Sequence, residues 1–271
     1  MKIIATTDFS ETAQNAVQYA LEMAKALDAE LILYHAYSFP LHASNAHLSA
    51  DAFQRLFETR LKRLSFEAAN FEAKFGVKVL AESTFAFVEE GLAELIKKYD
   101  ADLLVLGMAH KSLEQDLMGN TTTSAIKNLN IPILSIPIHV KFEGLKKVLF
   151  ACDQPDAVPD KVFAKIKETV LHLGGELEVF SVDSTIDELH AVETFPMSLN
   201  AQLEGINYYY RNVRSNSVIK EIAKEIDAFH ADILVMLPKK YGFWESMVHR
   251  SKTRIMASGL NIPLLSIPLG S

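Results

Sequence analysis

Two glycines and one aspartate in the first half of the chain are the residues whose surroundings suggest chemistry. Asp8 follows a short apolar run, Gly107 follows the apolar run 103–106, and Gly119 stands directly before the polar cluster 120–124. Asparagine and threonine in such a cluster can cap a helix, whose first N–H groups and positive dipole end then face the preceding loop. A glycine-containing loop that leads into a helix N-terminus favours phosphate binding. The pattern therefore indicates an anion site, although many strand–glycine–helix junctions are only tight turns.

Alternating strands and helices are predicted to position these residues. In the first half, strands are predicted at 3–7, 31–36, 77–82, 103–106 and 131–137, and helices at 10–27, 53–75, 88–99 and 120–128. Ser10 is the predicted N-cap of the first helix. Because no tight hairpin interrupts the alternation, the sequence predicts a parallel, doubly wound α/β sheet. In such sheets, ligands bind beyond the carboxyl ends of the strands.

The second half of the chain repeats the first. Four segments recur in the same order: 2–8 as 147–153, 30–38 as 176–184, 101–106 as 231–236, and 130–137 as 261–268. The offset falls from 146 at the second strand to 130 at the fourth, so the second half has about sixteen fewer residues between them. A strand at 206–213 and a helix at 218–229 complete the second copy. The repeat predicts two domains, 1–140 and 146–271.

With these motifs, each half resembles a universal stress protein domain, and the chain resembles a tandem universal stress protein. The resemblance is carried by TTDFSETA around Asp8, by the ADLLVLG strand, by the LMGNTTTSAI turn and by the closing NIPILSIP strand. It implies two five-stranded sheets of the adenine nucleotide alpha hydrolase-like fold, each with strand order 3-2-1-4-5. Strands 1 and 4 then flank the ligand crevice, so Asp8 is expected beside Gly107, with the turn at Gly119 closing over them.

The resemblance also implies a ligand and a domain arrangement. The expected ligand is ATP or AMP, at most one per chain, with Mg²⁺ only as a companion of the nucleotide. The implied nucleotide-binding residues are Asp8, Ala36, Leu106, Gly107, His110, Gly119, Asn120, Thr121 and Thr122. In this set, the carboxylate of Asp8 lies against the nucleoside and the backbone near Ala36 meets the base. The closing strands, 131–137 and 262–268, are expected to pair within the chain as a pseudo-dimer, and a further homodimer is compatible with this arrangement.

The first phosphate loop departs from the pattern of the ATP-binding members. Those members have a glycine, two residues, a second glycine, nine residues, and then glycine followed by serine or threonine. Here His110 stands at the second glycine, only eight residues separate it from Gly119, and Asn120 stands where serine is usual. Histidine tolerates positive φ better than most residues but is bulky. Two interpretations stay open: a degenerate loop that still binds nucleotide, with Lys111 supplying charge, and a purely structural turn. For Asp8, the alternative role is to cap the turn that follows it.

The second loop has lost more of the pattern. Pro238 follows the fourth strand, and Arg250 stands at the position that matches Gly119, since 119 + 131 = 250. Proline removes a donor, and the arginine side chain occupies space that phosphate needs. Only the first domain is therefore expected to bind nucleotide, and the matching Asp153 is expected to be structural. Two alternatives remain for the basic residues of this segment, a small anion site and a solvated basic loop; these residues are Lys239, Lys240, His249 and Arg250.

Composition narrows the function classes further. The 271 residues contain 27 basic and 34 acidic side chains, a formal charge of −7, which argues against a nucleic-acid or anionic-membrane partner. The single cysteine, Cys152, excludes an intrachain disulfide framework and fits a reducing compartment. With no signal peptide or membrane-spanning run recognised, the expected location is the cytoplasm.

Two functions from different classes follow. The first is a stress-response regulatory module that binds ATP or AMP in domain 1, and the alternative is a stress-linked interaction scaffold that binds no nucleotide. An enzyme is not expected beyond slow ATP hydrolysis, because no general base and nucleophile stand at a recognisable spacing. Neither catalytic residues nor a metal site are predicted.

Overall fold

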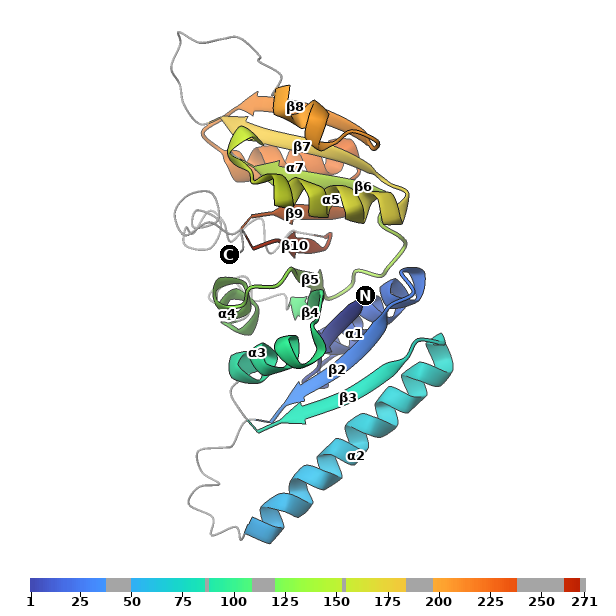
Figure 1. The fold of residues 1–271 in the computed structure, drawn as a ribbon. Helices are drawn as coiled ribbons and strands as arrows, with labels where there is room; N and C mark the ends of the chain where they lie inside the picture. Colours follow the sequence, from blue (N-terminus) through green and yellow to red (C-terminus); the bar gives the residue numbers. More distant parts are fainter. Residues whose placement is uncertain are drawn as a thin grey trace. The chain divides into compact units, whose positions relative to one another are not determined.

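The computed structural model describes residues 1–37, 50–85, 88–108, 120–152, 155–183, 197–237 and 261–268. Within these ranges, strands and helices alternate along the chain (Figure 1). The chain divides into two compact units. Unit 1 contains Met1–Met108 and Asn120–Lys141, and unit 2 contains the chain from Phe142 onward.

Unit 1 is built on a five-stranded parallel sheet. Its elements are β1 (Lys2–Thr6), α1 (Glu11–Ala26), β2 (Glu30–Ala36), α2 (Ala50–Phe75), β3 (Val79–Thr84), α3 (Val88–Tyr99), β4 (Leu103–Met108), α4 (Asn120–Asn128) and β5 (Ile133–Pro137). The strand order is β3-β2-β1-β4-β5, and every pair is parallel. This confirms the predicted parallel α/β fold, in the strand order that the family resemblance implies.

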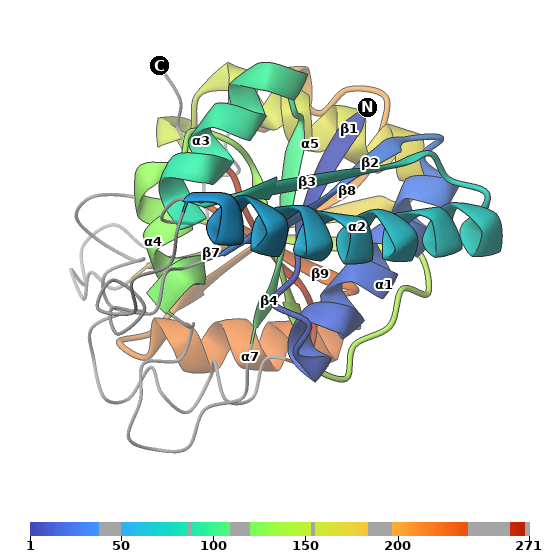
Figure 2. The same cartoon turned by 90° about the horizontal axis from the view of Figure 1, so that it is seen from below.

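Helices cover both faces of this sheet. α1 packs on β1 and β4 and also contacts α2, whereas α3 contacts α4 (Figure 2). The central strands are therefore buried on both sides, which explains why β1 and β4 read as continuous apolar runs. Ile3, Ile4 and Leu104, for example, are completely buried. α1 begins where the sequence predicts, because the Ser10 hydroxyl accepts a hydrogen bond from the Ala13 N–H at 3.2 Å and caps the helix.

Unit 2 also contains a five-stranded parallel sheet. Its elements are β6 (Lys147–Cys152), η1 (Pro155–Ala157), α5 (Asp160–Leu173), β7 (Glu176–Asp183), α6 (Met197–Gln202), β8 (Asn207–Arg214), α7 (Val218–Phe229), β9 (Ile233–Met236) and β10 (Leu264–Ser266). The order β8-β7-β6-β9-β10 is again parallel throughout. α6 has 6 residues where α2 has 26, in keeping with the shorter middle of the second half.

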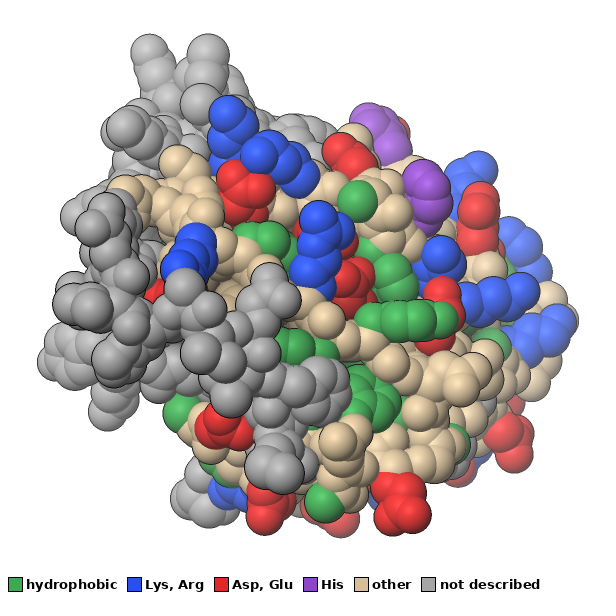
Figure 3. Space-filling model, turned by 90° about the horizontal axis from the view of Figure 1, so that it is seen from above, with side chains coloured by type: hydrophobic (Ala, Val, Ile, Leu, Met, Phe, Trp, Pro, Cys, Tyr) green, Lys and Arg blue, Asp and Glu red, His purple; other side chains and the backbone are tan. Residues whose placement is uncertain are grey.

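On the face shown in Figure 3, basic and acidic side chains are interspersed.

The two units share a set of anchoring contacts at the amino ends of their strands. In each unit, the first residue of the first strand donates its backbone N–H to an aspartate and its side-chain amine to the last residue of a helix. The four bonds are Lys2 N to Asp102 Oδ2 (2.8 Å), Lys147 N to Asp232 Oδ2 (2.8 Å), Lys2 Nζ to the Tyr99 carbonyl (2.8 Å) and Lys147 Nζ to the Phe229 carbonyl (3.1 Å). A lysine and an aspartate at matching positions thus make the same contacts in both units.

Candidate functional site

The candidate site lies at the carboxyl ends of β1 and β4 in unit 1. The two strands are neighbours, with Ala5 paired to Val105, so Asp8 and Gly107 follow the pair on the same edge of the sheet. The winding reverses between these strands, because the chain leaves β1 toward β2 and leaves β4 toward β5. A reversal of this kind opens a crevice at the carboxyl edge of a doubly wound sheet.

The turn after β1 is held by its own side chains. Asp8 Oδ1 accepts a hydrogen bond from the Ser10 N–H at 2.9 Å, and Thr7 Oγ1 accepts one from the Phe9 N–H at 3.0 Å. Asp8 therefore has the capping role that the sequence left as an alternative. Its side chain is nevertheless exposed. An exposed carboxylate retains acceptor capacity, so capping and ligand binding are compatible roles for Asp8.

Gly107 lies inside β4 rather than in a turn, since the strand continues to Met108 and Gly107 pairs with Ile136. A Cβ on residue 107 would lie 2.9 Å from both Cγ2 and the carbonyl oxygen of Thr12. Contacts that short do not occur without a shift of the neighbouring atoms. The close approach of α1 therefore accounts for glycine at this position, which the sequence had related to a phosphate loop.

The first turn of α4 lies beside the end of β4. Thr122 is 3% exposed, and its hydroxyl oxygen is 3.5 Å from the carbonyl oxygen of Gly107, at the outer limit for a hydrogen bond. Thr121 is exposed. The residues predicted to cap α4 thus lie within its first turns, because the helix begins at Asn120. Its N-terminus brings a positive dipole end to this edge.

The remaining predicted residues have different surroundings. Leu106 is 2% exposed, so its side chain belongs to the core and only its backbone could meet a ligand. Ala36 is the half-buried last residue of β2 and pairs with Thr84. The other predicted loop residues lie outside the described residues: His110, Lys111, Gly119, Asp153, Lys239, Lys240, His249 and Arg250.

An aromatic cluster that was not predicted from the sequence lies next to Asp8. The ring centroids of Phe9 and His35 are 4.8 Å apart, and those of His35 and Tyr37 are 4.0 Å apart. Phe9 has a φ of 65°, which is unfavourable for a bulky residue and places its ring in this cluster. A sequence signal existed, because Phe9, Tyr37 and Phe85 each follow closely on one of three neighbouring strands.

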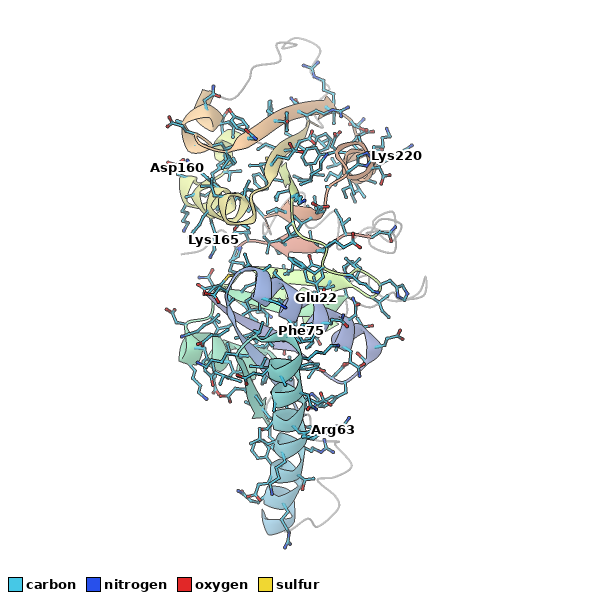
Figure 4. All side chains as sticks on the ribbon, turned by 90° about the vertical axis from the view of Figure 1, so that its right-hand side faces the viewer. Glu22, Arg63, Phe75, Asp160, Lys165 and Lys220 are labelled. Atoms are coloured by element: carbon cyan, nitrogen blue, oxygen red, sulfur yellow. The ribbon has the colours of Figure 1, made fainter. Side chains whose placement is uncertain are left out.

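Two arginines of α2 cover this cluster. The Arg63 guanidinium lies 4.6 Å from the centroid of Phe9, and that of Arg60 lies 4.8 Å from the centroid of Tyr37. Arg63 is labelled on α2 in Figure 4. Cation–π contacts of this kind bring positive charge to the neighbourhood of Asp8.

Burial decides the ionisation of His35. It lowers the pKa of the imidazole, and the two arginines lower it slightly, against the opposing effects of the Thr7 carbonyl and Asp8. His35 Nδ1 is 2.5 Å from the Thr7 carbonyl oxygen, which can only accept, so Nδ1 carries the proton. Burial also raises the pKa of Tyr37. Both rings are therefore neutral at neutral pH, and Asp8 and the arginines carry the charge.

Over residues 1–137, the chain matches the family model described as "Universal stress protein family". The chain belongs to the universal stress protein family. It is 28% identical over 137 residues to universal stress protein MJ0531 of Methanocaldococcus jannaschii, a match that covers 50% of this chain and 81% of the relative. It is 24% identical over 151 residues to universal stress protein MJ0577 of the same organism, covering 50% of this chain and 93% of the relative.

Solved structures extend the likeness of fold beyond the matched half. A universal stress protein from Archaeoglobus fulgidus is 17% identical and has a TM-score of 0.73, with 99% of this chain and 98% of that chain covered. A functionally unknown protein, PA1789 from Pseudomonas aeruginosa, is 13% identical with a TM-score of 0.60 and covers 98% of this chain and 92% of its own. At these identities the comparison supports the fold alone.

Two kinds of feature are absent from the part of this universal stress protein that the structure describes. Within the described ranges, no helix has the length and apolar character needed to cross a membrane. Among the same residues, no three His, Cys, Asp or Glu side chains come together as metal ligands would.

Proposed function

We propose that this universal stress protein is a tandem of two such domains, at about 1–140 and 146–271, and acts as a stress-response regulatory module that binds ATP or AMP in the first domain only. The matching anchoring contacts of Lys2 and Lys147 support the tandem. The observation that carries nucleotide binding is the exposed carboxylate of Asp8 at the winding reversal, beside the end of β4 and the N-terminus of α4.

The residues at this edge fit a nucleotide. The Asp8 carboxylate would accept hydrogen bonds from a nucleoside hydroxyl, and the backbone at Ala36 would meet the base. The Thr121 hydroxyl and the first N–H groups of α4 would donate to phosphate oxygens, which the helix dipole favours. A bound nucleotide would bring the negative charge of its phosphates to this edge of the sheet. Mg²⁺ would accompany it only as a counterion of the phosphates.

The arrangement of the two domains belongs to the same proposal. Residues 131–137 and 262–268 are apolar closing strands, and pairing between them within one chain would give an intrachain pseudo-dimer. Such pairing would cover strand edges that otherwise invite aggregation. A further homodimer is compatible with this arrangement, and the single cysteine fits the reducing cytoplasm.

An interaction scaffold that binds no nucleotide is the second candidate. One observation favours it: the contact with Thr12 alone is enough to explain Gly107, without any ligand. For the nucleotide-binding candidate, the proposal limits catalysis to slow ATP hydrolysis at most, whereas the scaffold would have no catalytic role.

Calorimetric titration of the full chain with ATP, ADP and AMP, with and without Mg²⁺, separates the candidates. Asp8→Ala should weaken binding of the preferred nucleotide at least about tenfold, because it removes a charged hydrogen-bond acceptor. The matched control is Asp153→Ala in the second domain, which should leave binding unchanged. If none of the three nucleotides binds to the wild-type protein, the scaffold is the correct candidate.

A further inference from the structure

Two glutamates are buried together in unit 2, away from the candidate nucleotide site. Glu178 of β7 is 5% exposed and Glu225 of α7 is 4% exposed. Glutamate is almost never buried to this extent unless it is paired, because the cost of removing a carboxylate from water is high. The pair lies where α7 packs on β6 and β7.

The charge of the pair is balanced by one proton. Arg211 Nη1 of β8 donates to Glu225 Oε1 at 2.7 Å, and Glu225 lies near enough to Glu178 to raise its pKa. Two ionised carboxylates buried beside one guanidinium would leave a negative charge uncompensated, which is costly away from water. With one proton and the Arg211 guanidinium, the three groups carry no net charge.

The other charges that face Glu178 do not change this balance. Lys147 Nζ of β6 lies 3.6 Å from Glu176 Oε1 and donates to the Phe229 carbonyl, so its charge is shared with the carboxylate of the first residue of β7. Burial first and Glu225 second raise the pKa of Glu178 to about 7, whereas Arg211 and Lys147 lower it. Proton loss therefore falls in a range that a cell can reach.

Unit 1 shows that the fold does not require this pair. α3 and α7 both have 12 residues, and alignment of these helices places Leu95 at the position of Glu225. Strands β2 and β7 align in the same way, with Ile32 at the position of Glu178. Ile32 is completely buried and Leu95 is 3% exposed, so unit 1 has buried apolar side chains at both matching positions. The two acids are therefore a property of unit 2 and not of the architecture.

We propose that Glu178, Glu225 and Arg211 form a proton-dependent latch, which holds α7 on the sheet of unit 2 while the carboxyls share a proton and loosens the helix when that proton is lost. Once the proton leaves, two buried negative charges face one arginine, and opening α7 to water relieves their repulsion. The ligand of this site is thus the proton, and the response is a local opening of α7.

The direction of the response follows from the two states of Glu178. Its ordinary pKa is 4.5, whereas in the closed structure it is about 7, so the closed state binds the proton more tightly. Opening therefore becomes easier as pH rises through this interval and levels off above it. We expect the equilibrium constant for opening α7 to rise at least about tenfold between about pH 5 and about pH 8, since one unit of pKa corresponds to a factor of ten.

Infrared spectroscopy of the full chain tests directly whether one carboxyl of the pair is protonated. A protonated carboxyl has a C=O stretching band that a carboxylate lacks, so the wild type should show a band that disappears near neutral pH. Glu178→Gln should lack that band, because the amide replaces the carboxylic acid while still donating to Glu225. If the wild type has no carboxyl band that titrates above about pH 6, the proposal is wrong.

Hydrogen exchange, corrected for the intrinsic pH dependence of amide exchange, tests the opening. Protection of the α7 amides should fall with rising pH in the wild type, whereas that of α3 should not. Protection of α7 should stay constant in Glu178→Gln and in the double variant Glu178→Ile with Glu225→Leu, which copies unit 1. If the double variant fails to fold, Glu178→Gln decides the result. Equal pH dependence of α7 in the wild type and in Glu178→Gln would overturn the proposal.

Discussion

Gly107 of β4 and Thr12 of α1 approach so closely that a Cβ on residue 107 would lie 2.9 Å from the Thr12 carbonyl oxygen. A backbone carbonyl in a helix cannot move aside as a side chain can. The contact therefore fixes the distance between α1 and β4, and with it the position of the turn that carries Asp8.

Gly107→Ala should destabilise unit 1 by about 1–3 kcal/mol, the usual cost of overpacking a well-packed interior. Urea denaturation monitored by circular dichroism measures the loss. Thr12→Ala in the Gly107→Ala background should restore only part of it, because it removes the contact with Cγ2 and leaves the carbonyl oxygen in place. Wild-type stability combined with a loss of nucleotide affinity would instead indicate that the glycine serves the ligand.

The proposed nucleotide site predicts a stoichiometry. Calorimetry should give at most one nucleotide per chain, because only the first half keeps Gly107 and Gly119, and Arg250 takes the matching place in the second half. Gly119→Arg, which copies the second half, should abolish binding and leave the circular dichroism spectrum unchanged. Two equivalent sites per chain would contradict the assignment of binding to the first domain.

His35 predicts an acid-sensitive component of stability in unit 1. Its pKa is lowered in the folded protein, mainly by burial, so below its ordinary value of 6.5 the unfolded chain binds a proton that the folded chain does not. The free energy of unfolding should therefore fall as pH decreases below about 6.5. His35→Phe keeps an aromatic ring between Phe9 and Tyr37, and its unfolding free energy should lack this component. Parallel pH profiles for the two proteins would show that His35 does not contribute.

The proposed pairing of the closing strands can be tested by truncation. Leu134 and Leu265 are predicted to lie in one apolar seam, so a fragment that ends before Lys141 should self-associate through its uncovered closing strand. Analytical ultracentrifugation over a range of concentrations measures the association. A fragment that stays monomeric at high concentration would place the seam elsewhere.

Local patterns in the sequence were sufficient to predict most elements. The helix 88–99 is found as predicted, with its apolar face buried at Leu92 and Leu95, and the helix 218–229 is also found as predicted. Ser10 caps α1 because a serine before a helical stripe needs only its immediate neighbours to act. The predicted strand ends were less accurate. The fourth strand was predicted to end at residue 106, but β4 continues through Gly107 because pairing with β5 determines its length.

The contacts that could not be predicted join residues far apart in the chain. Nothing near Gly107 in the sequence indicates that Thr12 excludes a side chain there. Phe9 adopts its positive φ where rings from β2 and charges from α2 surround it. Glu178 and Glu225 look like solvent-facing acids in the sequence, and only the packing of α7 on the sheet reveals that both are buried.

The lysine anchors lie at the amino ends of the strands in each unit, which in unit 1 is the edge of the sheet opposite Asp8. Lys2 and Lys147 tie the amino end of the first strand to the start of the fourth, whereas the loops in which the two halves differ follow the carboxyl ends of the strands. In each unit, the contacts at the amino ends of the strands are thus the same, whereas the loops at the carboxyl ends differ in sequence. Transplanting segment 109–119 into the second half, after β9, would therefore leave these bonds untouched. The experiment would thus change the loop at one edge of the unit 2 sheet while the framework at the other edge stays as it is.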